Sequence, residues 1–133
     1  MALKITLKPQ EKLIISGAVI TNGAGRSDFV VENSVPILRQ KDIMSLNAAD
    51  SPCKKIYFAI QLMYVDGKNM AEHHRAYWEL VQDVAAAAPS RKPLLQEISE
   101  NILQDRHYQA LKLTKKLIAY EQEVINRVRS TAT

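Results

Sequence analysis

The sequence is poor in the residues on which several classes of protein depend. It contains one cysteine, Cys53, in 133 residues, which excludes a disulfide framework and a cysteine-rich zinc site and is typical of a reducing cytoplasm. The longest apolar run extends from Ile56 to Val65 and is interrupted by Gln61, whereas a membrane span needs about 18 residues. The first residues contain no hydrophobic stretch of the kind found in secretory signals. We therefore expect a cytoplasmic protein without membrane insertion.

Motifs for catalysis and cofactor binding are also missing from the sequence. Gly23 and Gly25 lack the third glycine of a nucleotide-binding loop and lie in a predicted hairpin. His73 and His74 are adjacent, so on a helix they would point about 100° apart, and the apolar stripe through His74 predicts a core residue. Cys53 would need a base to act as a nucleophile, and no spacing supplies one. We expect no enzyme activity, catalytic residue, metal or cofactor.

Residues 3–38 show the pattern of short β-strands. Apolar and polar residues alternate at the start, which places the apolar ones on one face of a strand. Further apolar runs at residues 13–15, 18–20, 29–31 and 35–38 are separated by turn signals. Pro36 cannot donate to a β-ladder, so its strand should lie at an edge. We predict about five short antiparallel strands in a meander, sandwich half or barrel-like unit over residues 1–48.

From residue 51 onwards the apolar spacing is helical. Ser51 and Pro52 are typical of a helix N-cap and first position, although the apolar residues up to 65 would also suit a buried strand. A second helix is predicted over about 69–88, with Trp78 as a buried anchor in the core or at a helix interface. Residues 94–128 form either one helix or two. The prediction is an α+β protein in which a bundle of three to four helices over residues 49–133 shares a core with the strands.

Basic residues are concentrated in the first part of the chain. Residues 1–57 hold eight Lys and Arg against five Asp and Glu, which is +3 of the total charge of +4. This excess indicates either a solvated strand surface or a surface that binds phosphates. Phe29 is the only aromatic residue before Tyr57, so any nucleic acid would have to be bound through phosphates and shape rather than base stacking. The candidate residues for this contact, which would bind RNA phosphates if the ligand is RNA, are Lys4, Lys8, Lys12, Arg39, Lys41, Lys54 and Lys55.

Four stretches of the sequence carry a family resemblance. They are Leu3-Lys4 with Leu7-Lys8-Pro9 and Glu11-Lys12, Gly17-Ala18-Val19 with Asn22-Gly23, Leu38-Arg39 with Lys41-Asp42-Ile43-Met44, and Ile56-Tyr57-Phe58 with Leu62-Met63-Tyr64. In this order and spacing they resemble the FlbT family of flagellum biosynthesis repressors. The resemblance covers the β half and first helix well and continues more loosely to about Arg127. Gln10 and Gln40 depart from the glycine and glutamate expected there.

The resemblance implies a post-transcriptional regulator of flagellin. Such a protein would associate with the 5′ untranslated region of flagellin mRNA and change its stability or translation during flagellum assembly, as a repressor or an activator. The alternative is a protein-binding adaptor or chaperone, whose helical half would bind flagellin or another flagellar regulatory protein and affect the mRNA indirectly. Either function is compatible with a homo-oligomer.

Overall fold

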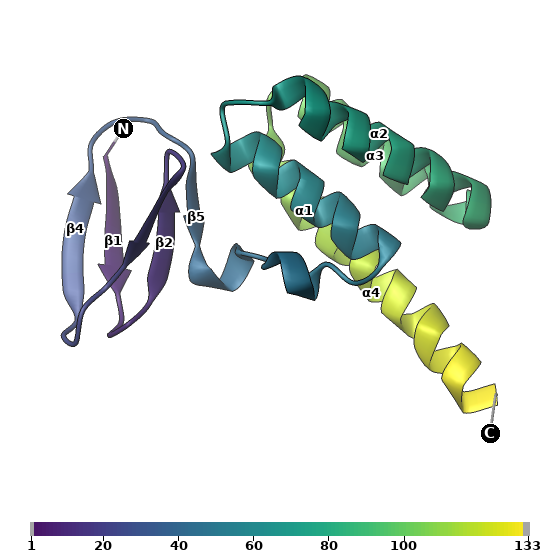
Figure 1. Cartoon of the computed structure of the whole chain (residues 1–133), viewed down its shortest axis with the longest axis horizontal. Helices are drawn as coiled ribbons and strands as arrows, with labels where there is room; N and C mark the ends of the chain where they lie inside the picture. Colours follow the sequence, from purple (N-terminus) through teal and green to yellow (C-terminus); the bar gives the residue numbers. More distant parts are fainter. Residues whose placement is uncertain (1, 132–133) are drawn as a thin grey trace. The chain divides into compact units, whose positions relative to one another are not determined.

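The computed structural model describes residues 2–131, in which five β-strands precede four α-helices (Figure 1). This arrangement confirms the predicted α+β class. The described residues divide into a β unit, residues 2–43 with Val65–Lys68, and a helical unit, Met44–Tyr64 with residues 69–131. Cooperative folding of these units as one domain stays a prediction. Within residues 2–131, none of the helices combines the length and hydrophobicity that crossing a membrane requires.

The β unit consists of two small antiparallel sheets. In one sheet β1 pairs with β4, and in the other the strand order is β3-β2-β5. The chain therefore does not form a continuous meander, because β1 pairs with a strand three places further along. As predicted from Pro36, β5 lies at the edge of its sheet. The strands are β1 (Leu3–Leu7), β2 (Lys12–Ile15), β3 (Ala18–Thr21), β4 (Ser27–Val31) and β5 (Ile37–Arg39).

Apolar side chains from both sheets meet in the core of the β unit. Ile5 and Leu7 of β1 and Leu13 of β2 are almost fully buried. Phe29 of β4 and Ile37 of β5 are among the half-buried side chains that pack against them. The alternation predicted for β1 holds at Ile5 and Leu7, which face the core while Lys4 is exposed. Leu3, which the pattern placed on the same face, is exposed.

Two turns in the β unit require left-handed backbone. Gln10 has a φ of 64°, and its N–H donates to the carbonyl of Gly23 over 3.0 Å. This conformation explains why the resemblance predicts glycine at position 10, since glycine adopts positive φ without steric cost. Gly17 has a φ of 87°, and a Cβ there would lie 2.8 Å from the carbonyl oxygen of Val65. Both features favour a residue without a side chain.

The helical unit contains four α-helices, and the apolar residues 56–65 form a helix rather than a strand. The open question over residues 94–128 is settled as two helices, because the chain turns at Gln104–Arg106, where Asp105 has a φ of 61°. Short 3-10 segments occupy Gln40–Asp42, Leu46–Ala48 and Pro89–Arg91. The helices are α1 (Pro52–Val65), α2 (Met70–Ala87), α3 (Lys92–Leu103) and α4 (His107–Thr131).

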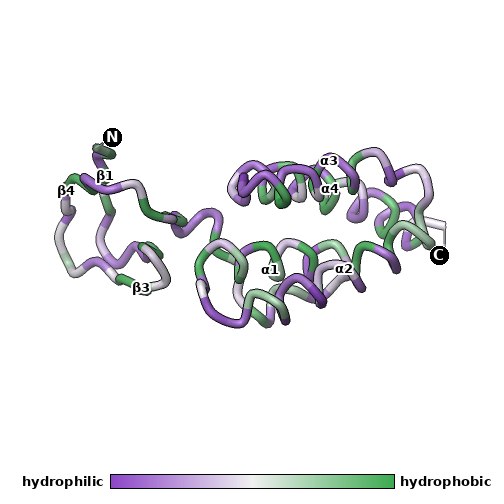
Figure 2. The backbone as a smooth tube through the Cα atoms, turned by 90° about the horizontal axis from the view of Figure 1, so that it is seen from above, coloured by the Kyte–Doolittle hydropathy of each residue, from purple (hydrophilic) through white to green (hydrophobic). Residues whose placement is uncertain are grey.

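A buried polar contact lies inside the helical core. The hydroxyl groups of Tyr77 and Ser99 are 2.7 Å apart, and Tyr77 is fully buried. The prediction that Trp78 is buried is wrong, because its side chain is 37% exposed. Adjacent residues on a helix point about 100° apart, so only one of these two rings can fill the core. Hydrophobic and hydrophilic segments alternate along the helices in Figure 2, as amphipathic helices require.

Candidate functional site

The first three predicted RNA-binding residues lie on the β unit. Lys4 is exposed on the outer face of β1, and Lys8 is exposed just after that strand. Lys12 is exposed at the start of β2, where its Nζ donates to Thr21 Oγ1 over 3.1 Å. Lys4 and Lys12 belong to different sheets. Asp28, which accepts a hydrogen bond of 2.6 Å from Thr6, adds an acidic group to the outer face that carries Lys4.

The next two candidate residues, Arg39 and Lys41, also lie in the β unit, but only Arg39 makes a contact between the sheets. The guanidinium of Arg39 in β5 donates to the carbonyl of Thr6 in β1 over 3.0 Å, so Arg39 links the two sheets. Lys41 is exposed in the 3-10 segment that follows β5. Between them, Gln40 Oε1 accepts from the Lys12 N–H over 2.6 Å. Of these residues, Lys41 is the one whose position suits contact with an external phosphate.

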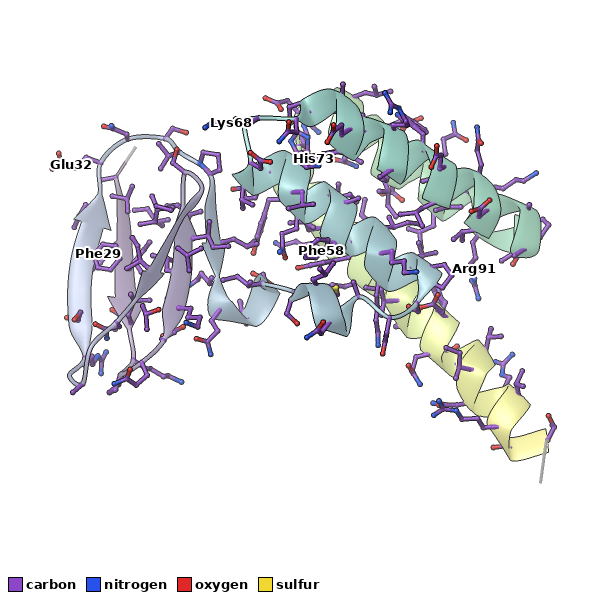
Figure 3. All side chains as sticks on the ribbon, in the orientation of Figure 1. Phe29, Glu32, Phe58, Lys68, His73 and Arg91 are labelled. Atoms are coloured by element: carbon purple, nitrogen blue, oxygen red, sulfur yellow. The ribbon has the colours of Figure 1, made fainter. Side chains whose placement is uncertain are left out.

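Lys54 and Lys55 lie at the start of α1 in the helical unit. Lys54 Nζ is 3.1 Å from Asp50 Oδ1 and forms an ion pair with it, whereas Lys55 is exposed. The seven candidates are therefore divided between the two units. Phe29 packs against the β core rather than standing free for base stacking, and Figure 3 shows it inside the β unit. A basic surface on the β unit would rest mainly on Lys4, Lys8 and Lys41.

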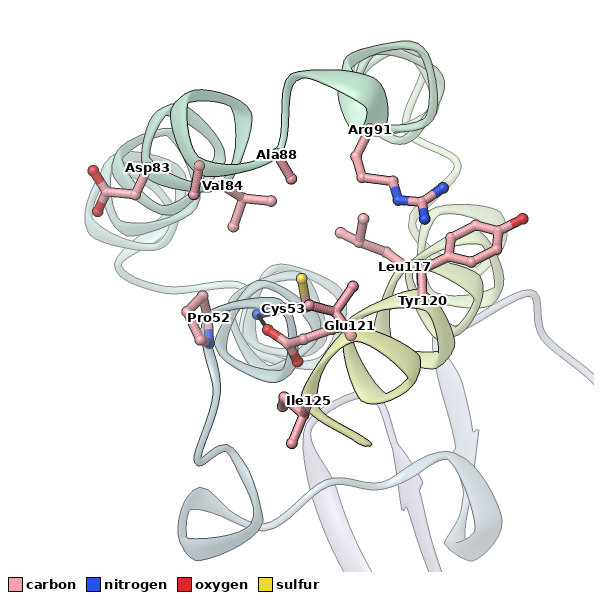
Figure 4. Close-up of a pocket in the computed structure, with 12 residues that line it drawn as sticks. Pro52, Cys53, Asp83, Val84, Ala88, Arg91, Leu117, Tyr120, Glu121 and Ile125 are labelled. Carbon is pink, nitrogen blue, oxygen red and sulfur yellow. Dashed lines mark hydrogen bonds between the residues drawn. The ribbon is translucent and has the colours of Figure 1, made fainter. Parts of the chain in front are cut away.

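An apolar groove of about 420 Å³ lies in the helical unit, and sequence analysis did not find it. Its walls come from the start of α1, the end of α2 and the second half of α4 (Figure 4). No local motif could reveal it, because segments far apart in the chain contribute its lining. The lining residues are Pro52, Cys53, Asp83, Val84, Ala87, Ala88, Arg91, Leu117, Tyr120, Glu121, Val124 and Ile125.

Two charged side chains in this groove have internal partners. The Arg91 guanidinium lies 3.9 Å from the centre of the Tyr120 ring, a cation–π contact. Glu121 accepts hydrogen bonds from the Cys53 N–H over 3.0 Å and from the Ser51 hydroxyl. Its carboxylate therefore caps α1, where backbone N–H groups lack helical partners. The predicted N-cap is confirmed, since Ser51 Oγ accepts from the Lys54 N–H over 3.3 Å.

Cys53 lines this groove with an unreactive thiol. Burial, the negative charge of Glu121 and a hydrogen bond with that residue together raise the pKa of Cys53 to about 12, and burial contributes most. The thiol therefore stays protonated at neutral pH, and only a thiolate is an effective nucleophile. This environment agrees with the expectation that Cys53 carries no chemistry.

His107, the first residue of α4, is a titratable group with a buried ring nitrogen and a lowered pKa. Its Nδ1 lies 3.3 Å from Asp105 Oδ1, and within residues 2–131 its buried Nε2 makes no hydrogen bond. Burial lowers the pKa of His107, with opposition from Asp105 and a smaller lowering by His74. His74 is half-buried rather than fully in the core. No three His, Cys, Asp or Glu side chains in the described range are placed to hold a metal.

A second groove of about 430 Å³ runs between α2 and α3. Trp78 and Leu103 both line it, and they are 37% and 73% exposed. Lys92 and Glu100 add one charge of each sign to the lining. The groove thus presents an accessible tryptophan, a residue type enriched at protein–protein interfaces, beside an accessible leucine.

Comparison with known proteins identifies the family. The model of the flagellar protein FlbT matches residues 3–125. The chain belongs to the FlbT family. The probable flagellum biosynthesis repressor protein FlbT 1 of Bradyrhizobium diazoefficiens is 41% identical over 98% of this chain and 90% of its own length. The flagellum biosynthesis repressor protein FlbT of Caulobacter vibrioides is 34% identical over 98% and 94%.

A third relative, the probable repressor FlbT of Caulobacter sp. strain K31, is 35% identical over 96% of this chain and 99% of its own length. The names of these relatives support a regulatory role in flagellar expression for this FlbT-family chain. No solved structure shows a significant match to the chain.

Proposed function

We propose that this FlbT-family protein regulates flagellin after transcription, by associating with the 5′ untranslated region of flagellin mRNA and changing its stability or translation. The observation that carries RNA contact is the set of exposed lysines on the β unit, at positions 4, 8 and 41. Lysine ammonium groups bind phosphates and release counterions from the RNA. Because Phe29 packs against the β core, the binding would depend on phosphates and RNA shape rather than stacked bases.

The test is binding of the purified chain to a flagellin leader RNA over a series of salt concentrations. The triple variant Lys4→Gln, Lys8→Gln and Lys41→Gln should flatten the log–log salt dependence by up to about two units and weaken binding to all RNA sequences similarly. The β core should survive, because Ile5 and Leu7 occupy the opposite face of β1.

A matched control removes the same charge from α4, through Lys112→Gln, Lys115→Gln and Lys116→Gln, three exposed positions. This control should leave the salt slope unchanged. The proposed β surface is refuted if the α4 variant flattens the slope and the β-unit variant does not. Absence of any binding to the leader RNA would refute direct RNA contact altogether.

The second candidate function is a protein-binding adaptor, and the α2–α3 groove favours it. Trp78 is the single tryptophan of the chain and is partly exposed in this groove. Its emission should therefore shift to shorter wavelength when a tryptophan-free flagellin covers it. Leu103→Glu should abolish the shift, whereas Leu46→Glu, at a site outside the groove that is 72% exposed, should not. An unchanged spectrum at saturating flagellin would refute docking in this groove.

A further inference from the structure

The second half of α4 carries an apolar stripe that its own unit covers only in part. In the first half of the helix, Ala110 and Leu117 are buried against the bundle. A step of seven residues returns to the same side of a helix, so this face continues at Val124. No described residue of α4 after Leu117 is buried, and Tyr120, Val124 and Val128 are 37%, 51% and 61% exposed. The core-facing stripe thus extends beyond the core.

The last turns of α4 project from the helical unit. In Figure 1 these turns, drawn in yellow, extend away from α2 and α3. The groove of about 420 Å³ is continuous with the stripe, because Tyr120 and Val124 line both. Residues 118–131 span about 21 Å at 1.5 Å per residue, which is roughly four turns of helix.

Charged residues beside the stripe indicate which partner fits it. Glu123 and Arg127 are exposed and lie one turn apart on one flank of the stripe, because residues four apart share a helix face. When two identical helices pack antiparallel, each flank meets the same flank of the other copy. With the two-fold axis near residue 125, Glu123 faces Arg127 of the second copy, and this pairing occurs twice. Antiparallel packing would therefore make the flank complementary to itself.

We propose that two copies of this chain associate through the second halves of their α4 helices, packed antiparallel across Tyr120, Val124 and Val128. Parallel packing would instead bring the Glu123–Arg127 flank against the opposite one, where Glu121 already caps α1. The paired segment is short, so the interface is smaller than the about 800 Å² per partner of standard complexes. The dimer therefore dissociates at low protein concentration.

Sedimentation velocity of the full chain tests the proposal over about 1–200 µM, a range suited to a weak interface. The wild-type chain should change from monomer to dimer within this range. Val124→Glu places a charge at the centre of the stripe and should raise the dissociation constant at least about 100-fold. Arg129→Glu, on the opposite side of α4, is the matched control and should leave the constant unchanged. Circular dichroism should show native helix content in both variants.

A charge exchange tests the antiparallel arrangement. Glu123→Arg and Arg127→Glu should each weaken the dimer about tenfold, because both place like charges opposite each other twice. An equimolar mixture of the two single variants should recover wild-type association, as should the double variant. A monomeric wild type at 200 µM, or a dimer insensitive to Val124→Glu, would overturn the α4 interface. Weakening by both single variants without recovery in the mixture would overturn the antiparallel register.

Discussion

Glu121 is a side chain from α4 that completes the start of α1, and its replacement provides a direct test of the helical unit. Its carboxylate accepts from the Cys53 N–H over 3.0 Å and from the Ser51 hydroxyl. These two residues are more than 65 positions away in the sequence. The Glu121→Ala variant removes both contacts and the negative charge near the helix N-terminus while leaving the rest of α4 in place.

The expected loss of stability follows from the groups that donate hydrogen bonds to Glu121. Loss of a cap interaction destabilises a helix by about 0.5–2 kcal/mol, and loss of a favourable charge at the helix N-terminus adds about 0.3–1 kcal/mol. The Ser51 hydroxyl is half-buried and can turn towards water. We therefore expect Glu121→Ala to lower the free energy of unfolding by about 0.8–3 kcal/mol. Glu121→Gln keeps an acceptor oxygen without the charge and should lose about half as much.

Urea unfolding followed by circular dichroism at low protein concentration measures this change without a contribution from association. Glu79→Ala, at an exposed position on α2, is the control and should change the free energy by less than about 0.5 kcal/mol. A Glu121→Ala variant as stable as this control would show that the carboxylate does not hold α1 to α4. The structural account of the groove would then be wrong.

Three further predictions concern other sites. The pKa of His107 is lowered in the folded chain, so the unfolded chain binds protons more readily and the free energy of unfolding should fall as the pH decreases through about 6.5. The difference in the free energy of unfolding between pH 8 and pH 5.5 should be smaller for His107→Gln than for wild type. Ser99→Ala leaves the buried Tyr77 hydroxyl without its partner at 2.7 Å and should cost about 1–3 kcal/mol in urea unfolding. Gln10→Gly relieves a φ of 64° and should raise the melting temperature of the β unit, corresponding to about 0.5–1 kcal/mol; a lower melting temperature would contradict it.

The sequence by itself determined the kinds of secondary structure and most of their positions. Three features depend on neighbours a few residues apart: the alternation of β1, the turn signals and the Ser51 cap. They can therefore be predicted from the sequence alone. The same local information predicted the edge position of the Pro36 strand. The family resemblance also rests on local stretches, and the glycine that it led us to expect at position 10 suits the left-handed turn that the structure shows there.

Only the tertiary structure decided which distant residues meet. The pairing of β1 with β4 depends on long-range packing, which no periodicity encodes. Glu121 looked like any exposed acidic residue until the fold placed it at the start of α1. The basic residues were predicted by charge alone, and the fold divided them between two units and used Arg39 as a link. Binding surfaces combine residues from separate segments, so their composition emerges only when the chain has folded.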